Sequence, residues 1–255
     1  MFKNYLSIIW IRGIGALKAD AENSYLGSLW WVLEPILLTA LFYVAFATGL
    51  KGGGKGSDFV YFLICALIPF KWTSSSITGS SSSITSNKGI LGQFYLPKWI
   101  FPTAVNFSML LRFLFVLPIL CIFVAMGGYE PQVVWFFVLP ILICQLFINL
   151  GFSYLTAAMV PLIPDLKHLV SLGMTAILFT SGIFFDINSR PESVQELLRL
   201  NPFVTIFDSY RAVLLRGEFL ELHTLLYPCL FAVFAYTIGA ITLRRFDRYY
   251  PRTLL

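Results

Sequence analysis

Two basic residues, Lys71 and Arg112, lie inside long runs of apolar residues. In a membrane-spanning helix, a cation near the bilayer centre costs about 3 kcal/mol on insertion scales. Each cation is therefore expected to face an opposite charge or a water-filled cavity. Two interpretations remain open: the cations hold a helix bundle together, or they line a hydrated route for a polar or anionic passenger.

Glu34 is a further charged residue in these apolar runs, and it precedes Pro35 about one helical turn inside the first predicted span. It could pair with a cation, but its expected depth matches neither Lys71 nor Arg112. The sequence therefore assigns it no partner.

Hydroxyl side chains follow Lys71 in the segment 73–86, TSSSITGSSSSITS, and occur on every side of a helix. They favour a hydrated path, which we expect to be lined partly by Lys71, Trp72, Ser76 and Arg112. Small residues also allow helices to pack closely in membranes, which is the alternative.

The composition is typical of a polytopic membrane protein and excludes an ordinary soluble domain. Hydrophobic residues make up 58% of the chain and charged residues only 12%, with a mean hydropathy of +0.78. A soluble domain usually carries about twice that share of charge. The net charge of +5 follows the predicted membrane topology, so we expect no nucleic-acid partner.

The sequence predicts neither a disulfide nor a metal site. The four cysteines lie in apolar runs without paired spacing, and the two histidines are isolated: Cys65, Cys121, Cys144, Cys229, His168 and His223. Such cysteines are typical of small buried hydrophobic residues.

The apolar runs predict an all-α fold with six membrane spans, because a span needs roughly 20 residues. The predicted spans are 29–50, 59–84, 100–126, 133–162, 169–185 and 225–243. Residues 1–25 are expected to form an amphipathic helix in the membrane interface, with Leu6, Ile9, Trp10, Gly13 and Leu17 on its apolar face. A degenerate first span is the alternative, which Arg12 makes costly.

Basic residues are distributed unequally between the two sides of this predicted bundle. The side with both termini holds ten: Lys3, Arg12, Lys18, Lys88, Lys98, Lys167, Arg244, Arg245, Arg248 and Arg252. The other side holds six: Lys51, Lys55, Arg190, Arg199, Arg211 and Arg216. The positive-inside rule therefore places both termini, and a tail at 244–255, in the cytosol.

The segment Ser83–Pro102 separates two apolar runs and is expected on the cytosolic side. Ile90, Leu91, Phe94 and Tyr95 would share one face of a short helix. We expect this helix to lie on the membrane surface and to meet a soluble partner; the alternative is a solvated turn.

Residues 186–223 form the only sizeable segment on the opposite side. Pro191 fits a helix start, Asn201-Pro202 breaks the pattern, and a second apolar repeat ends near Gly217. Two short amphipathic helices could dip into the outer leaflet and gate an exit. A surface hairpin that packs on the spans is the alternative.

A glycine-rich stretch, Gly49–Lys55, nearly matches a phosphate-binding Walker loop. Gly56 stands where the Mg-binding Ser or Thr belongs, and the stretch follows a span rather than a strand. We therefore expect no ATPase and no cofactor in this chain.

Several motifs, in this order, resemble the membrane subunits of ABC transporters that export bacterial polysaccharides. The motifs are Leu26-Gly27-Ser28-Leu29-Trp30-Trp31-Val32-Leu33-Glu34-Pro35, Ala66-Leu67-Ile68-Pro69-Phe70, Asn87-Lys88-Gly89-Ile90-Leu91, Tyr95-Leu96-Pro97-Lys98-Trp99-Ile100-Phe101-Pro102, Pro164-Asp165-Leu166, and Leu200-Asn201-Pro202-Phe203 followed by Arg211. Each motif alone is weak, but together they cover nearly the whole chain and are specific.

The resemblance implies a dimeric six-span permease in the bacterial inner membrane, bound to two copies of a separate subunit that uses ATP and Mg. It implies that a coupling helix docks into that subunit through Asn87, Lys88, Gly89, Ile90, Leu91, Gly92 and Gln93. Members of the family export a glycan on a polyprenyl diphosphate lipid. Arg12 and Lys18 are then expected to meet the diphosphate where the lipid enters. The implied gate contains Leu197, Asn201, Pro202, Phe203, Phe207 and Arg211.

Some positions depart from the pattern of the family. Gly92-Gln93 stands where many relatives have a basic pair, and Pro164 stands where many have Arg before the acidic residue. Glu34-Pro35 favours capsule permeases, whereas Tyr95–Pro102 favours O-antigen permeases. The sequence thus predicts glycan export and leaves O-antigen, capsule and teichoic acid open.

Two other functions are compatible with parts of the sequence. A membrane-embedded enzyme acting on lipid-linked sugars would need an acid/base pair, for which Asp186, Glu192 and Glu196 are the clustered candidates. An ion-coupled transporter would work through Glu34 and Lys71. A requirement for a co-purifying ATPase separates export by an ABC transporter from both.

Overall fold

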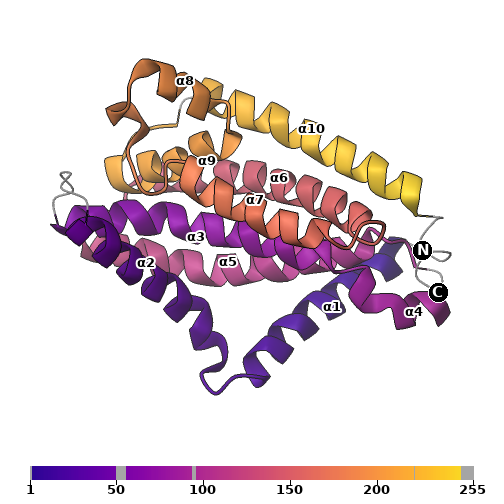
Figure 1. Ribbon diagram of the computed structural model, residues 1–255. Helices are drawn as coiled ribbons and strands as arrows, with labels where there is room; N and C mark the ends of the chain where they lie inside the picture. Colours follow the sequence, from indigo (N-terminus) through magenta and orange to yellow (C-terminus); the bar gives the residue numbers. More distant parts are fainter. Residues whose placement is uncertain (1, 50–55, 94–95, 221, 248–255) are drawn as a thin grey trace.

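The computed structural model describes residues 2–49, 56–93, 96–220 and 222–247, and every regular element in this part of the chain is helical (Figure 1). The all-α expectation is therefore confirmed. The α-helices are α1 (Phe2–Glu22), α2 (Trp30–Gly49), α3 (Gly56–Ser81), α4 (Lys88–Gln93), α5 (Ile100–Met126), α6 (Val138–Met159), α7 (Leu166–Thr180), α8 (Glu192–Arg199), α9 (Pro202–Arg211) and α10 (Leu222–Phe246). Short 3-10 or π turns are η1 (Gly27–Leu29), η2 (Thr85–Asn87), η3 (Val133–Phe137), η4 (Ile187–Ser189) and η5 (Ala212–Arg216).

Five of the described segments are long and apolar enough to cross a membrane. They are Gly27–Ala45, Asp58–Ser81, Ile100–Met126, Val133–Met159 and His223–Phe246. The predicted span 169–185 differs, because α7 has 15 residues and reaches about 22 Å, less than the roughly 30 Å of a hydrocarbon core. The helix ends at Thr180, and Gly182 has φ +67° where the chain turns.

Helices α1 and α2 form a V beside the bundle (Figure 1). The start of α1 lies at the same end of the bundle as α4 and the end of α10, and the ring of Tyr5 lies 6.1 Å from that of Trp99. The far end of α1 reaches the middle of α5, where Asp20 contacts Arg112. We call residues 20–34, which contain the turn of the V, the elbow.

Helix α2 continues from the elbow to the opposite end of the bundle. Trp31 lies 5.7 Å from Phe115 near the middle of α5, and Phe42 lies 4.6 Å from Phe184 beyond α7. The chain from α1 to α2 thus crosses the length of the bundle in two inclined helices. The candidate span Gly27–Ala45 agrees with the predicted first span at 29–50. The interface position expected for residues 1–25 stays a prediction.

The face of α1 that contacts the protein differs in part from the predicted apolar face. Ile9 and Gly13 are buried, whereas Leu6 and Trp10 are exposed. A Cβ added at Gly13 would lie 2.5 Å from the ring of Phe107. Because α5 approaches so closely at Gly13, α1 packs against the bundle through the face that contains Ile9 and Gly13.

Helix α3 lies at the centre of the bundle, and its residues Leu63–Phe70 are all buried. Helices α5, α6 and α9 cover it. Helices α6 and α10 touch through their backbones: a Cβ at Gly239 would lie 2.3 Å from the carbonyl oxygen of Gly151.

The segment between α7 and α10 contains the two predicted short helices. Asn201 caps α9 through a hydrogen bond that its Oδ1 accepts from Phe203 N at 3.0 Å, and Gly217 has φ +63° where the second helical piece ends. Helix α8 is mostly exposed, whereas α9 is buried among α3, α6 and α10. The break and the end were therefore predicted at the correct residues, but α9 is part of the core.

Candidate functional site

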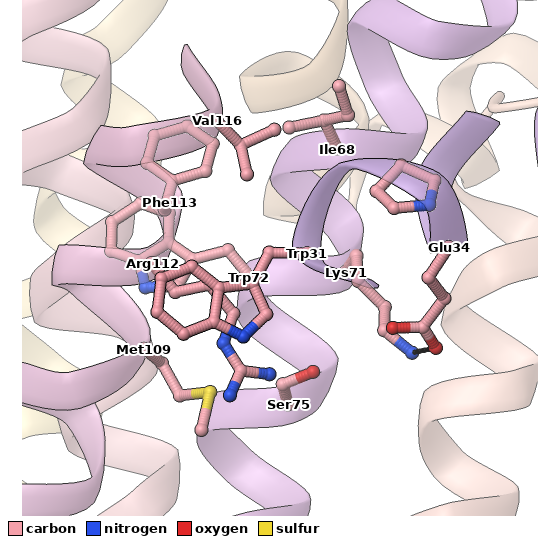
Figure 2. Close-up of a pocket in the computed structure, with 11 residues that line it drawn as sticks. Trp31, Glu34, Ile68, Lys71, Trp72, Ser75, Met109, Arg112, Phe113 and Val116 are labelled. Atoms are coloured by element: carbon pink, nitrogen blue, oxygen red, sulfur yellow. Dashed lines mark hydrogen bonds and ion pairs between the residues drawn. The ribbon is translucent and has the colours of Figure 1, made fainter. Parts of the chain in front are cut away.

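A pocket lies where the elbow meets α3 and α5 (Figure 2). Its lining residues are Trp31, Glu34, Pro35, Ile68, Lys71, Trp72, Ser75, Met109, Arg112, Phe113 and Val116. The volume is about 40 Å³. One water needs roughly 10–15 Å³ in such a measure, so the pocket holds a few waters and no sugar ring.

Lys71 pairs with Glu34 across this pocket, with 2.5 Å between Nζ and Oε1 (Figure 2). The sequence assigned Glu34 no partner because the start of a span was expected near the membrane surface. In the structure α2 begins beside the middle of the bundle, so Glu34 and Lys71 lie at the same depth. The expectation that Lys71 faces an opposite charge or a cavity is met in both ways.

Arg112 pairs with Asp20 at the end of α1, and its guanidinium lies 5.1 Å from the ring centroid of Trp31. A guanidinium over an indole face gains about 0.5–2 kcal/mol. Both cations of the pocket therefore come from the central bundle, and both counter-charges come from the elbow.

The two ion pairs differ from fully buried ones, because their side chains are 24–53% exposed. Exposed pairs contribute about 0–1 kcal/mol, whereas an unpaired cation inside the apolar layer costs about 3 kcal/mol. The main effect of the two pairs is therefore to neutralise the two cations, and their own contribution to stability is small. They leave the site with no net charge.

The other two residues predicted to line the path occupy different places. Trp72 lines the pocket and stacks on Phe113 at 4.5 Å. Ser76 is fully buried, does not line the pocket, and its carbonyl oxygen accepts a hydrogen bond from Ser153 of α6 at 3.2 Å. For Ser76, the structure therefore favours the alternative of close helix packing.

A row of polar residues on α6 was missed by sequence reasoning. Gln145, Asn149 and Ser153 are buried against α3, and Gln145 donates to Thr73 Oγ1 at 2.8 Å and accepts from Tyr210 at 2.9 Å. Their spacing of four residues within an apolar run was a signal that could have found them, because it places them on one helix face.

The predicted coupling segment forms α4, preceded by the turn η2. Lys88, Gly89, Ile90 and Gln93 are exposed, whereas Leu91 packs against a cluster that contains Ile84 and Phe101. A Cβ at Gly89 would meet no atom within 4 Å. The outward face of α4 is therefore open, and its inward face is anchored at the junction of α3 and α5.

Arg12 joins α1 to the entrance of α4, because its guanidinium donates to Asn87 Oδ1 and lies 4.9 Å from the ring centroid of Phe101. Lys18 is exposed. The two residues are six positions apart, about 240° around the helix, so α1 presents them on different sides. The structure does not bring Arg12 and Lys18 together.

The predicted gate residues divide between the surface and the core. Leu197 on α8 is exposed, whereas Pro202, Phe203 and Phe207 on α9 are buried. Asn201 caps α9 and also donates to Ser181 Oγ at 2.8 Å, which ties α9 to the end of α7.

Arg211 is the most strongly buried cation of this segment, with 2% of its surface exposed. It donates to the carbonyl oxygens of Phe62, Gly182 and Ile183 at 2.8–3.0 Å. Burial lowers the pKa of Arg211 to about 10, so it remains a cation at neutral pH. Arg211 thus fixes α9 to α3 and to the turn after α7.

We expect Arg211→Lys to destabilise the protein by about 1–3 kcal/mol, because an ammonium cannot reach all three carbonyls and a buried acceptor without a donor costs about that much. Thermal unfolding in nanodiscs measures the effect. The matched control is Arg216→Lys, whose exposed pairs with Asp208 and Glu218 contribute about 0–1 kcal/mol. Equal effects of the two substitutions would contradict this role of Arg211.

The carboxylates considered for an enzyme, Asp186, Glu192 and Glu196, are all exposed on the segment of η4 and α8. Asp186 accepts a hydrogen bond from the backbone N of Asn188, as a turn cap does. Within the described residues there is no group of three or more metal-ligating side chains. The arrangement matches solvated caps rather than an acid/base pair.

Comparison with known proteins gives consistent matches. Residues 13–215 match the family described as ABC-2 type transporter. The chain is 30% identical over 201 residues to an O-antigen export system permease protein RfbA from Myxococcus xanthus, which covers 77% of this chain and 76% of the relative. A protein of the same name from Klebsiella pneumoniae is 27% identical over 202 residues, with 79% of this chain and 77% of the relative covered.

Proposed function

Because the chain belongs to the ABC-2 type transporter family, we propose that it is the membrane subunit of an ATP-driven exporter of an O-antigen-type polysaccharide. The names of its relatives support this passenger. The glycan would travel on a polyprenyl diphosphate lipid. ATP and Mg would bind to a separate subunit that hydrolyses ATP.

The observation that carries the proposal is the position of α4. It is exposed at one end of the bundle, it connects α3 to α5 in the chain, and Arg12 ties its entrance to α1. A force on α4 would therefore reach three helices directly. This geometry fits a coupling helix that transmits the stroke of an ATPase subunit.

The assembly would contain two copies of this chain and two ATPase subunits. The pocket at the elbow has a volume of only about 40 Å³, so a glycan path along its residues is better formed between two copies than inside this pocket. Lys71, Trp72 and Arg112 would lie along that path. Charges at the exposed end of α1 favour a hydrated surface there over contact with lipid.

The topology would place both termini in the cytosol of a bacterium, in its inner membrane. Helix α7 would serve as a short sixth crossing, extended by the turns at its ends. The excess of basic residues near α4 and near Arg244 supports this orientation. On the opposite side, α8 and α9 would cover the exit, with Arg211 holding α9 and Leu197 on the outer face.

Reconstitution with its ATPase tests this function. The purified chain in proteoliposomes is expected to translocate lipid-linked O-antigen only when the ATPase subunit and ATP are both present. A Walker-lysine variant of the ATPase serves as control. Translocation by the chain alone, or driven by an ion gradient without ATP, would contradict the proposal.

A further inference from the structure

The pocket at the elbow has hydrogen-bond donors without acceptors. Trp72 Nε1 and Arg112 Nε lack a partner in the described part of the chain, and both residues line the pocket. An indole N–H and a guanidinium can only donate. Both nitrogens are buried in the present arrangement, so a ligand could reach them only after the elbow moves, and it would have to be an acceptor.

The acceptors that now neutralise the pocket belong to the elbow. Asp20 and Glu34 are 53% and 45% exposed, so water reaches both ion pairs. A pair of this kind contributes about 0–1 kcal/mol, so another anion can replace the carboxylate at little cost. The cations themselves always need a counter-ion, because of the cost of a bare charge in an apolar layer.

The two cations line the same pocket at a similar distance from the α4 end of the bundle. Lys71 is ten residues from the α4 end of α3, and Arg112 is twelve residues from the α4 end of α5. At 1.5 Å per residue, they lie about 15 and 18 Å from those ends. Arginine binds phosphate or carboxylate oxygens in a bidentate manner, and a lysine at the same depth adds a second charge. A neutral sugar could not replace a carboxylate at either cation.

We propose that Lys71 and Arg112 form an exchangeable binding site for a phosphate-type oxyanion, whose binding displaces Glu34 and Asp20 and frees the elbow from α3 and α5. The inference rests on the proposed function, because the oxyanion arrives with the exported molecule or with a lipid headgroup. Much of the elbow is already exposed, including Tyr25, Leu29 and Trp30. Loss of two ion pairs therefore removes much of its polar attachment and opens the bundle beside α2.

Binding of radiolabelled inorganic pyrophosphate tests the site, using the complex with its ATPase in phosphatidylcholine nanodiscs. Lys71→Gln with Arg112→Gln is expected to weaken binding at least about tenfold. Asp20→Asn with Glu34→Gln is expected to tighten binding about tenfold. The two carboxylates no longer compete with pyrophosphate for the cations, so the state that can bind the anion becomes the main one.

A charge swap separates binding from folding. Glu34→Lys with Lys71→Glu keeps an ion pair, so the protein is expected to accumulate normally, yet it should bind pyrophosphate more weakly than the wild type. Equal binding by the swap and the wild type, or no tightening in Asp20→Asn with Glu34→Gln, would overturn the proposal and leave the pairs a purely structural role.

A competition experiment identifies the source of the oxyanion. If phosphatidylglycerol in the nanodisc competes with pyrophosphate, a lipid headgroup uses the site; if it does not compete, the site serves the anionic group of the exported molecule. Either result requires the site to exist. A complex that exports with ATP but shows no difference between the variants would refute this inference and leave the proposed function intact.

Discussion

Replacement of Gly89 and Ile90 by Asp is expected to reduce export to background while the protein stays in the membrane. Both residues lie on the open face of α4, and a side chain at Gly89 meets no atom of this chain within 4 Å. The fold should therefore tolerate the change. An unpaired carboxylate buried under a docked ATPase costs about 3–5 kcal/mol, which corresponds to at least about a 100-fold loss in affinity.

The measurement combines export of O-antigen in cells with co-purification of the ATPase. The matched control is Gly89→Ala, which adds a methyl group in open space and favours the helix by about 1 kcal/mol, so export should persist. Leu91 is a poorer target because it packs against the cluster of Ile84 and Phe101. Normal export by the double Asp variant would exclude α4 as the docking element.

Local signals explain which parts of this structure could be predicted from the sequence. The start of α9 and the end of η5 follow from nearby residues: Asn201 caps α9, Pro202 starts it, and Gly217 accepts a positive φ after η5. Such rules depend on the chain within a few residues of the site. The predicted and observed helices therefore agree closely at these places.

The pairing of the charges could not be predicted in the same way. It depends on the position of the elbow along α5. This position is set by packing between helices that are far apart in the sequence, so no local sequence pattern predicts it. A span that starts at the membrane surface would leave Glu34 far from Lys71, whereas the observed V of α1 and α2 brings them to 2.5 Å. The end of α7 also depends on packing. The predicted span ran to residue 185, but the helix ends at Thr180 because the apolar residues after it turn into the core.

The structure separates a tightly packed part from a loosely attached part. Helices α3, α5, α6, α9 and α10 enclose the main core, and α6 and α10 meet at backbone distance. The candidate span that contains α2 is the least buried of the five, with 11% of its most apolar stretch buried. Two ion pairs tie the elbow to the core. A stroke at α4 would therefore move the elbow against a stable core more easily than it would deform that core.

Replacing glycine by alanine at the contact of α6 with α10 is expected to destabilise this core strongly. A Cβ at Gly151 would lie 2.5 Å from the backbone of Ala235 and Tyr236, and one at Gly239 would lie 2.3 Å from Gly151 O. Backbone atoms cannot rotate away as a side chain can, so the helices must separate. We expect Gly151→Ala or Gly239→Ala to cost about 3 kcal/mol or more, measured by thermal unfolding and by the amount of protein in the membrane.

Gly173→Ala in α7 is the matched control, because a Cβ there meets no atom within 4 Å. It should be neutral or stabilise the protein by up to about 1 kcal/mol through helix propensity. Gly151→Ala and Gly239→Ala act at one contact, so the double variant should cost less than the sum of the single ones. Additive effects, or a loss at Gly173 as large as at Gly151, would show that the α6–α10 contact does not carry the stability of the bundle.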